Sequence, residues 1–296
     1  MRTSAVSALA AALIGLAGHS ASAQGPPPPL PKFPTYSSTV VTIETRPGVT
    51  VTYVATRRVW PPGLNPHPVA LVLLAGGNGV LQIAPNGSIQ SSLKLNFLIR
   101  SRPNFLLSGA ALVVAVDAPS DKPQGMNGAF RQSQPHAEDL AKVIEKVKTD
   151  TGLTVWLVGT SSGTMSVANA AARKLPPTAA GFVLASTQTM IDAGSGCGKT
   201  VFDAAPPFGL GAITAPVYVV AHLQDACPCS PPVGMYGANA VVAALTGSSK
   251  KESKFFTGGK APVSGVCGAQ HYHGFYGVEK SVTKAIVDWI KSSSPL

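Results

Sequence analysis

Apolar residues along this chain gather in short unbroken runs, and between the runs they recur with the spacing of one helix face. The runs predict buried strands at 69–74, 110–116, 153–158, 181–185 and 216–221. Unbroken apolar runs of this length are typical of parallel strands that are covered on both faces of a sheet. The segments between them predict helices at 96–107, 135–151, 164–175 and 277–291.

Two of these helices carry additional signals. In 135–151, apolar residues fall at i, i+3, i+4 and i+7, and the residues concerned are Leu140, Val143, Ile144 and Val147. We expect the helix at 96–107 to be bent or broken at Pro103, because proline lacks the N–H group that an interior helical position needs.

The chain's first strands follow a different pattern. The β-rich segments 39–45 and 49–59 flank the sequence Arg46-Pro47-Gly48, which indicates an antiparallel hairpin. Strands then alternate with helices, a pattern typical of a parallel sheet with helices on both faces. We therefore predict the α/β class, with a mostly parallel central sheet and a small antiparallel start.

The N-terminus predicts export. Arg2 precedes an apolar stretch, and Ala21-Ser22-Ala23 forms a small-residue cleavage site, so residues 1–23 are predicted to be a secretory signal peptide. Residues 24–36 read as a proline-rich tether, and 37–296 as the folded domain. We expect a periplasmic or secreted protein without stable membrane insertion, since no later apolar run reaches the length of a membrane span.

Charge narrows the choice of partners. The formal net charge is +10 at pH 7, but the basic residues are scattered and no segment combines dense Lys and Arg with aromatic residues. Nucleic-acid binding is therefore not expected, and a generally basic surface is the preferred interpretation. The oligomeric state is not predicted.

Four cysteines occur in this chain, at 197, 227, 229 and 267. An oxidising compartment favours disulfides, and four cysteines allow three pairings. Because Cys227 and Cys229 are too close in sequence to bridge easily, we expect Cys227–Cys267 together with Cys197–Cys229.

One pentapeptide points to chemistry. The run 153–158 ends in Gly159-Thr160-Ser161-Ser162-Gly163, and a helical pattern follows. A G-x-S-x-G sequence between strand and helix forces its serine into a tight bend that exposes the hydroxyl. We therefore predict that Ser161 is a nucleophile. The alternative interpretation is a Gly/Ser-rich loop at a strand end that has no catalytic role.

A serine nucleophile needs a base, and the base needs an orienting carboxylate. Asp225 follows the strand predicted at 216–221 and is the favoured acid. The weaker candidates are Asp117, which we interpret as a loop cap, and Asp192 and Asp203, which lie in an irregular segment.

The favoured base is His273, in the sequence His273-Gly274-Phe275 just before the last predicted helix. His271 is the reserve candidate, and His222 is interpreted as a packed core histidine. The order Ser161, Asp225, His273 along the chain is the order used by α/β-hydrolases.

Acyl chemistry also requires N–H donors for a developing oxyanion. Ser162 can supply one backbone N–H at the start of a helix. The loop 76–79 after the strand at 69–74 can supply a second, with Gly77 as first choice and Asn78 as the next.

Two other motifs lack the context that their chemistry needs. The segment 193–200 ends like a phosphate-binding loop, but prolines and glycines follow it where a helix would have to begin. His271 and His273 with a nearby Cys or Asp suggest a metal site, yet the cysteines are expected to be oxidised. We predict neither a metal nor any other cofactor.

With these residues in place, the chain resembles the α/β-hydrolase superfamily, most of all exported bacterial members described as hydrolases or esterases. The resemblance runs from about residue 69 to the C-terminus. Its carriers are LLAGGNG, NFLIRSR, VVAVDAPSD, VWLVGTSSGT, the strand ending at Asp225 with Cys227-Pro228, and HGF before the last helix. Departures are Ala75, where many relatives have His, and Ala221-His222, where the usual pair is H-G.

The resemblance implies an α/β-hydrolase fold, no large lid, and a serine hydrolase acting on small-molecule carboxylic esters through an acyl-enzyme. Ser161 would attack, His273 would transfer the proton, and Asp225 would orient the imidazole. The alternatives are a peptidase or amidase using the same residues, and an envelope binding protein that has lost the chemistry.

Overall fold

The computed structural model describes residues 34–192, 197–200 and 209–294. For residues 191, 192 and 197–200 it describes the backbone alone. The predicted signal peptide, most of the predicted tether and Asp203 lie outside these ranges. The strands of the main sheet are β1 (Tyr36–Arg46), β2 (Val49–Arg58), β3 (His67–Leu74), β4 (Ala110–Val116), β5 (Thr154–Thr160), β6 (Gly181–Ala185), β9 (Val217–His222) and β10 (Lys251–Phe256).

The helices of the described residues are α1 (Phe97–Arg100), α2 (Arg102–Leu107), α3 (Gly128–Arg131), α4 (Gln134–Thr151), α5 (Gly163–Arg173), α6 (Ala238–Ala244) and α7 (Glu279–Ser293). A separate hairpin pairs β7 (Met190–Asp192) with β8 (Cys197–Thr200). Short 3-10 turns include η1 (Ser92–Leu95), η3 (Leu210–Ala212) and η4 (Tyr272–Gly274).

The main sheet has the strand order β1-β2-β4-β3-β5-β6-β9-β10. Strand β1 is antiparallel to β2, and β2 is antiparallel to β4, whereas all other neighbouring pairs are parallel. The predicted mostly parallel sheet with an antiparallel start is therefore confirmed. The carboxyl ends of the parallel strands share one edge, where ligand sites of open α/β sheets form.

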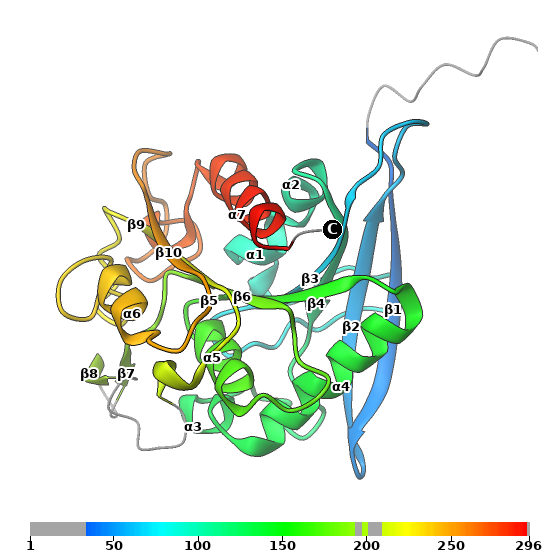
Figure 1. Ribbon diagram of the computed structural model, residues 1–296, viewed down its shortest axis with the longest axis horizontal. Helices are drawn as coiled ribbons and strands as arrows, with labels where there is room; N and C mark the ends of the chain where they lie inside the picture. Colours follow the sequence, from blue (N-terminus) through cyan, green and yellow to red (C-terminus); the bar gives the residue numbers. More distant parts are fainter. Residues whose placement is uncertain (1–33, 193–196, 201–208, 295–296) are drawn as a thin grey trace, which may run out of the picture. The chain divides into compact units, whose positions relative to one another are not determined.

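Alternate side chains of the parallel strands enter two different cores. On β3, Ala70, Val72 and Leu74 pack with α4, α5 and α6, while Val69 and Leu71 pack with α1, α2 and α7. Figure 1 shows these two helical layers on either side of the sheet. Continuous apolar strands are required here because both faces are buried.

The expected break in the helix at 96–107 is present, but it lies at Ser101 rather than Pro103. Pro103 occupies the first turn of α2, where its missing N–H costs nothing. Strand β10 was not predicted, because its sequence KESKFF is charged and partly exposed rather than apolar. It lies at the sheet edge, where lysines are common.

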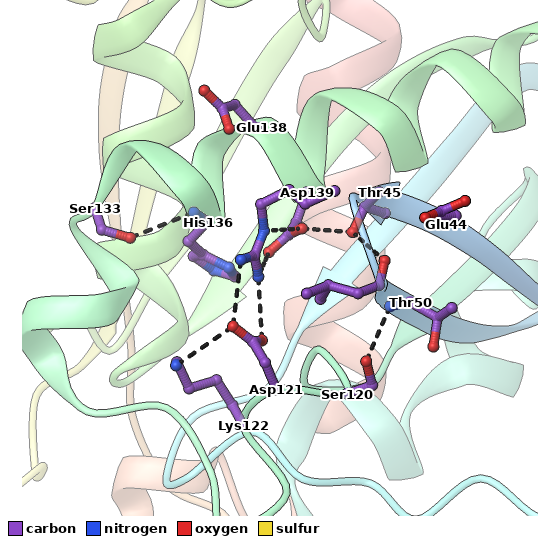
Figure 2. A network of polar contacts seen from close by, with 12 residues as sticks. Glu44, Thr45, Thr50, Ser120, Asp121, Lys122, Ser133, His136, Glu138 and Asp139 are labelled. Carbon is purple, nitrogen blue, oxygen red and sulfur yellow. Dashed lines mark hydrogen bonds and ion pairs between the residues drawn. The ribbon is translucent and has the colours of Figure 1, made fainter.

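A charged network fastens the first hairpin to α4. Asp139 is buried, and it accepts hydrogen bonds from Thr45 Oγ1 at 2.5 Å, from Arg46 Nε at 2.8 Å and from Arg46 Nη2 at 3.0 Å. Arg46 also forms an ion pair with the half-exposed Asp121 at 3.1 Å (Figure 2). Burial alone would raise the pKa of Asp121, but Arg46 and Lys122 outweigh that effect and lower it.

Replacing Asp139 with asparagine is expected to lower the free energy of unfolding by roughly 2–3 kcal/mol, because the Arg46 guanidinium loses the more buried of its two charged partners. Urea denaturation followed by circular dichroism measures this loss. Glu138→Gln, on the neighbouring and more exposed position of α4, should stay within about 0.5 kcal/mol. Equal midpoints for the two variants would contradict the assignment.

Candidate active site

Ser161 lies in the bend between β5 and α5, and its φ of +52° puts it in the left-handed region. Such a conformation is rare for a residue with a side chain and is held here by close backbone packing. A Cβ on Gly163 would come 2.1 Å from the carbonyl oxygen of Leu74, and one on Gly159 would come 2.6 Å from that of Gly163. Only glycine fits at these positions, so the two glycines of the motif allow the bend.

Asp225 and His273 lie beside each other although 48 residues separate them. Asp225 follows β9, and its Oδ2 lies 2.9 Å from Nδ1 of His273, while its Oδ1 accepts the Cys227 N–H at 2.9 Å. Both side chains are buried. The neutral imidazole that donates Nδ1–H to a carboxylate carries its acceptor lone pair on Nε2. This Nε2 is buried and has no hydrogen-bond partner among the described residues.

The loop that carries His273 is fixed at several points. The Ser186 hydroxyl donates to the carbonyl oxygen of His273 at 2.8 Å. Phe275 has a φ of +56° and is fully buried, with its ring centroid 4.8 Å from that of Phe97. Arg100 donates to the Gly274 carbonyl at 2.6 Å and forms an ion pair with Glu279 at 2.9 Å. These contacts hold the His273 imidazole in one orientation.

A cavity of about 300 Å³ lies next to both Ser161 and His273. Ser161 and His273 line it together with Gly76 and Gly77, and no Asp, Glu, Lys or Arg side chain of the described residues contributes to its wall. The remaining lining residues are Ser92, Leu93, Leu95, Asn96, Phe97, Thr160, Ser264, Cys267, Ala269, Gln270 and Gly274. The cavity thus suits an uncharged group next to the Ser161 hydroxyl.

The predicted N–H donors divide into two groups. Gly77 lines the cavity with a φ of +59°, and Ser162 directly precedes α5. Asn78 does not line the cavity: its Oδ1 accepts the Val80 N–H and its Cβ lies against Gly125, and the role of its backbone N–H stays a prediction. Gly76, which the sequence did not single out, lies closest to the serine, because a Cβ there would come 2.7 Å from that of Ser161.

The weaker candidates Asp117, His222 and His271 do not line the cavity. Asp117 accepts N–H groups from Leu81 and Ile83 and so caps a loop, as interpreted from the sequence. His222 is fully buried, and its Nε2 lies 2.9 Å from the Gly258 carbonyl oxygen, which fits a packed core histidine. Burial lowers the pKa of His222. His271 precedes η4 and does not line the cavity.

A disulfide joins Cys227 to Cys267 and confirms one predicted pairing. It ties the loop that carries Asp225 to the segment that forms one cavity wall, since Cys267 lines the cavity. The second predicted pairing, Cys197–Cys229, stays a prediction because the side chain of Cys197 lies outside the described residues.

Replacing Cys227 and Cys267 together by serine is expected to lower the free energy of unfolding by roughly 3–4 kcal/mol, the value for a cross-link between residues 40 apart. Urea denaturation of the double variant measures the loss. An unchanged midpoint would show that the cross-link does not restrict the unfolded chain.

The other motifs gain no support as binding sites. Residues 197–200 form β8, and the segment 201–208, where no helix was expected, lies outside the described residues. Within the described ranges, no three His, Cys, Asp or Glu side chains gather in a way that could hold a metal ion. No helix in that part of the chain is long and apolar enough to cross a membrane.

Several residues of the site were missed in the sequence. The cavity wall formed by Leu93, Leu95 and Phe97 comes from η1 and the start of α1, which precede Ser161 by more than sixty positions. Arg100, which holds the histidine loop, sits in the NFLIRSR segment without any local signal of that contact. Such contacts depend on tertiary packing and leave no periodic pattern.

No protein-family model matches the chain, and no curated protein matches its sequence. Its structure is similar to that of an α/β serine hydrolase without a lid from Xanthomonas campestris, at 15% identity and a TM-score of 0.56 over 90% of this chain and 100% of that chain. It is also similar to a fungal esterase from Rhizomucor miehei, at 13% identity and a TM-score of 0.58 over 89% and 84% of the two chains.

A structure of prolyl endopeptidase matches over 88% of this chain but 39% of its own, at 14% identity and a TM-score of 0.55. Solved esterases and α/β serine hydrolases therefore share the fold of this chain, as the resemblance in the sequence implied. At these identities the similarity concerns the fold.

Proposed function

We propose that this protein is a serine hydrolase that cleaves small, uncharged carboxylic esters through an acyl-enzyme. The observation that carries the proposal is the environment of His273. Its Nδ1 faces the buried carboxylate of Asp225, and its Nε2 has no hydrogen-bond partner in the part of the chain that the structure describes. His273 lines the same cavity as the strained Ser161.

In the first half of the proposed reaction, Ser161 Oγ attacks the ester carbonyl carbon while His273 Nε2 takes the hydroxyl proton. Asp225 keeps the acceptor lone pair on Nε2 and stabilises the imidazolium that forms. The carbonyl oxygen becomes an oxyanion, for which the N–H groups of Gly77 and Ser162 are the proposed donors. Collapse breaks the bond to the alcohol oxygen, and that oxygen takes the proton from His273.

In the second half, water replaces the alcohol. His273 Nε2 removes a proton from the water as its oxygen attacks the acyl carbon. A second oxyanion forms and collapses, the bond to Ser161 Oγ breaks, and the serine oxygen regains its proton. The products are a carboxylic acid and an alcohol, and the chain's own residues suffice for every proton transfer.

Ester specificity rests on the cavity and on the fold neighbours. An uncharged wall with Leu93, Leu95 and Phe97 suits a neutral acyl or alcohol group, and several structures with this fold are described as esterases. The fold is also that of a prolyl endopeptidase, so a peptidase or amidase is the second candidate. A binding protein without chemistry is the third.

Export is part of the proposal. The predicted signal peptide and the Cys227–Cys267 disulfide both fit an oxidising compartment outside the cytoplasm. Mass spectrometry of the exported protein after expression with the native leader should find a mature chain that begins at Gln24, and an exported chain that still begins at Met1 would contradict cleavage of this leader.

A fluorophosphonate probe tests the chemistry directly. Labelling followed by peptide mapping should place the adduct on Ser161, and a matched panel of p-nitrophenyl esters and p-nitroanilides should show faster ester cleavage. Amide cleavage at comparable rates would favour the peptidase reading. Folded protein that neither labels nor hydrolyses any member of the panel would favour the binding protein.

A further inference from the structure

A buried arginine lies behind the loop that faces Ser161. Arg131 ends α3, and none of its surface is exposed to solvent. Within the described residues it forms no ion pair with a carboxylate, although a guanidinium is costly to bury without one. The groups that the guanidinium contacts offer an explanation for this buried charge.

Its contacts converge on the loop after β3. Arg131 Nη2 donates to the carbonyl oxygen of Gly77 at 3.0 Å and to that of Ala75 at 3.2 Å. Arg131 Nη1 donates to the hydroxyl of Ser166 on α5 at 2.9 Å. One planar guanidinium thus links the loop bearing Gly76 and Gly77 to the helix that begins just after Ser161.

The residues next to this guanidinium leave room for it and add no second positive charge. Gly79 has a φ of +77°, and a Cβ there would come 2.8 Å from Arg131 Nη2. Ser166 also lies 2.9 Å from Nε2 of the buried His136. Burial, followed by the charges of Arg131 and Arg46, lowers the pKa of His136 to about 3, so that the imidazole is neutral at pH 7 and adds no second charge. Burial also lowers the pKa of Arg131, to about 10, which leaves it protonated at pH 7.

We infer that Arg131 is a positioning residue for the oxyanion-binding loop, an inference that rests on the proposed function. The carbonyls of Ala75 and Gly77 that it holds belong to the two peptide planes on either side of the plane that carries the Gly77 N–H, so Arg131 restricts the orientation of that proposed donor. Charge-assisted hydrogen bonds are shorter and stronger than neutral ones, which suits a loop whose donors have to be in place before charge develops.

The test uses Arg131→Met, which keeps the length of the side chain and removes its donors. With active sites titrated by fluorophosphonate, kcat on p-nitrophenyl acetate should fall at least tenfold, while KM changes less than threefold. The inhibition constant of trifluoroacetophenone, which forms an oxyanion adduct with serine, should rise by the same factor as kcat/KM falls. A structural defect alone would lower the titrated fraction instead.

Arg46→Met is the matched control, because it removes an arginine that fastens the hairpin to α4. It should lower the melting temperature and leave kcat per titrated site unchanged. If Arg131→Met does not fold, Arg131→Lys, which keeps the charge without the planar fork, should lower kcat threefold to tenfold and raise the inhibition constant in parallel.

Wild-type kcat and inhibitor binding in whichever Arg131 variant folds would overturn the inference while leaving the proposed function intact. A wild-type protein that neither labels nor hydrolyses esters would instead refute the proposed function and this inference together. The two failures are therefore distinguishable.

Discussion

Ester hydrolysis is expected to fall by roughly four to six orders of magnitude in Ser161→Ala, since the proposed nucleophile is lost while the cavity is kept. Fluorophosphonate labelling should disappear with it. Steady-state kinetics on p-nitrophenyl acetate and gel-based labelling measure the two effects. Ser292→Ala, at the exposed end of α7, is the matched control and should retain full activity.

The same position carries a second expectation about stability. Ser161 has a φ of +52°, and its Cβ lies close to the backbone of Gly76. Ser161→Gly removes the strained side chain, so the free energy of unfolding should rise by about 1 kcal/mol while activity is lost. Residual hydrolysis or labelling at wild-type rates in either Ser161 variant would refute the nucleophile assignment.

The second large effect is expected for Asp225→Asn, with a fall in kcat of about 10⁴-fold at neutral pH. The asparagine carbonyl can still accept the Cys227 N–H, so the loop should keep its shape. Its amide group, however, donates to Nδ1 of His273 and moves the imidazole proton to Nε2. A protonated Nε2 cannot take the proton from Ser161.

Stopped-flow or steady-state kinetics with p-nitrophenyl acetate measures this loss, and circular dichroism checks that the fold is kept. Asp288→Asn, which removes a carboxylate from an exposed ion pair on α7, serves as the control with unchanged kcat. If Asp225→Asn retained more than a tenth of wild-type activity, another group would have to orient His273.

The parts of the fold that could be predicted from the sequence are those that produce a local pattern of residues. The apolar runs that became β3, β4, β5, β6 and β9 needed only the rule that doubly covered strands are apolar throughout. Asp225 and His273 were chosen because each follows or precedes a recognisable element, and the structure brings them within 2.9 Å. The role of each stays a prediction until it is measured.

The contacts that escaped prediction are set by packing across the sequence. Gly76, which lies close to Ser161, was passed over for Gly77 and Asn78, because which residue of a glycine-rich loop approaches a serine depends on the path of that loop in space. Arg131 gave no signal, since its partners are two backbone carbonyls more than fifty residues away and a serine hydroxyl 35 residues away. Strand β10 was hidden by its charges, which an edge position tolerates.

The order of the proposed reactive groups along the chain has a consequence for biosynthesis. Ser161 lies near the middle, whereas Asp225 and His273 belong to the last quarter, and a cross-link closes only once Cys267 is in place. In the proposed mechanism, a nascent polypeptide that lacks Asp225 and His273 therefore carries an unactivated serine hydroxyl. Hydrolytic activity then arises only after the last quarter of the chain has been synthesised and folded. Turnover therefore indicates that maturation of the chain is complete.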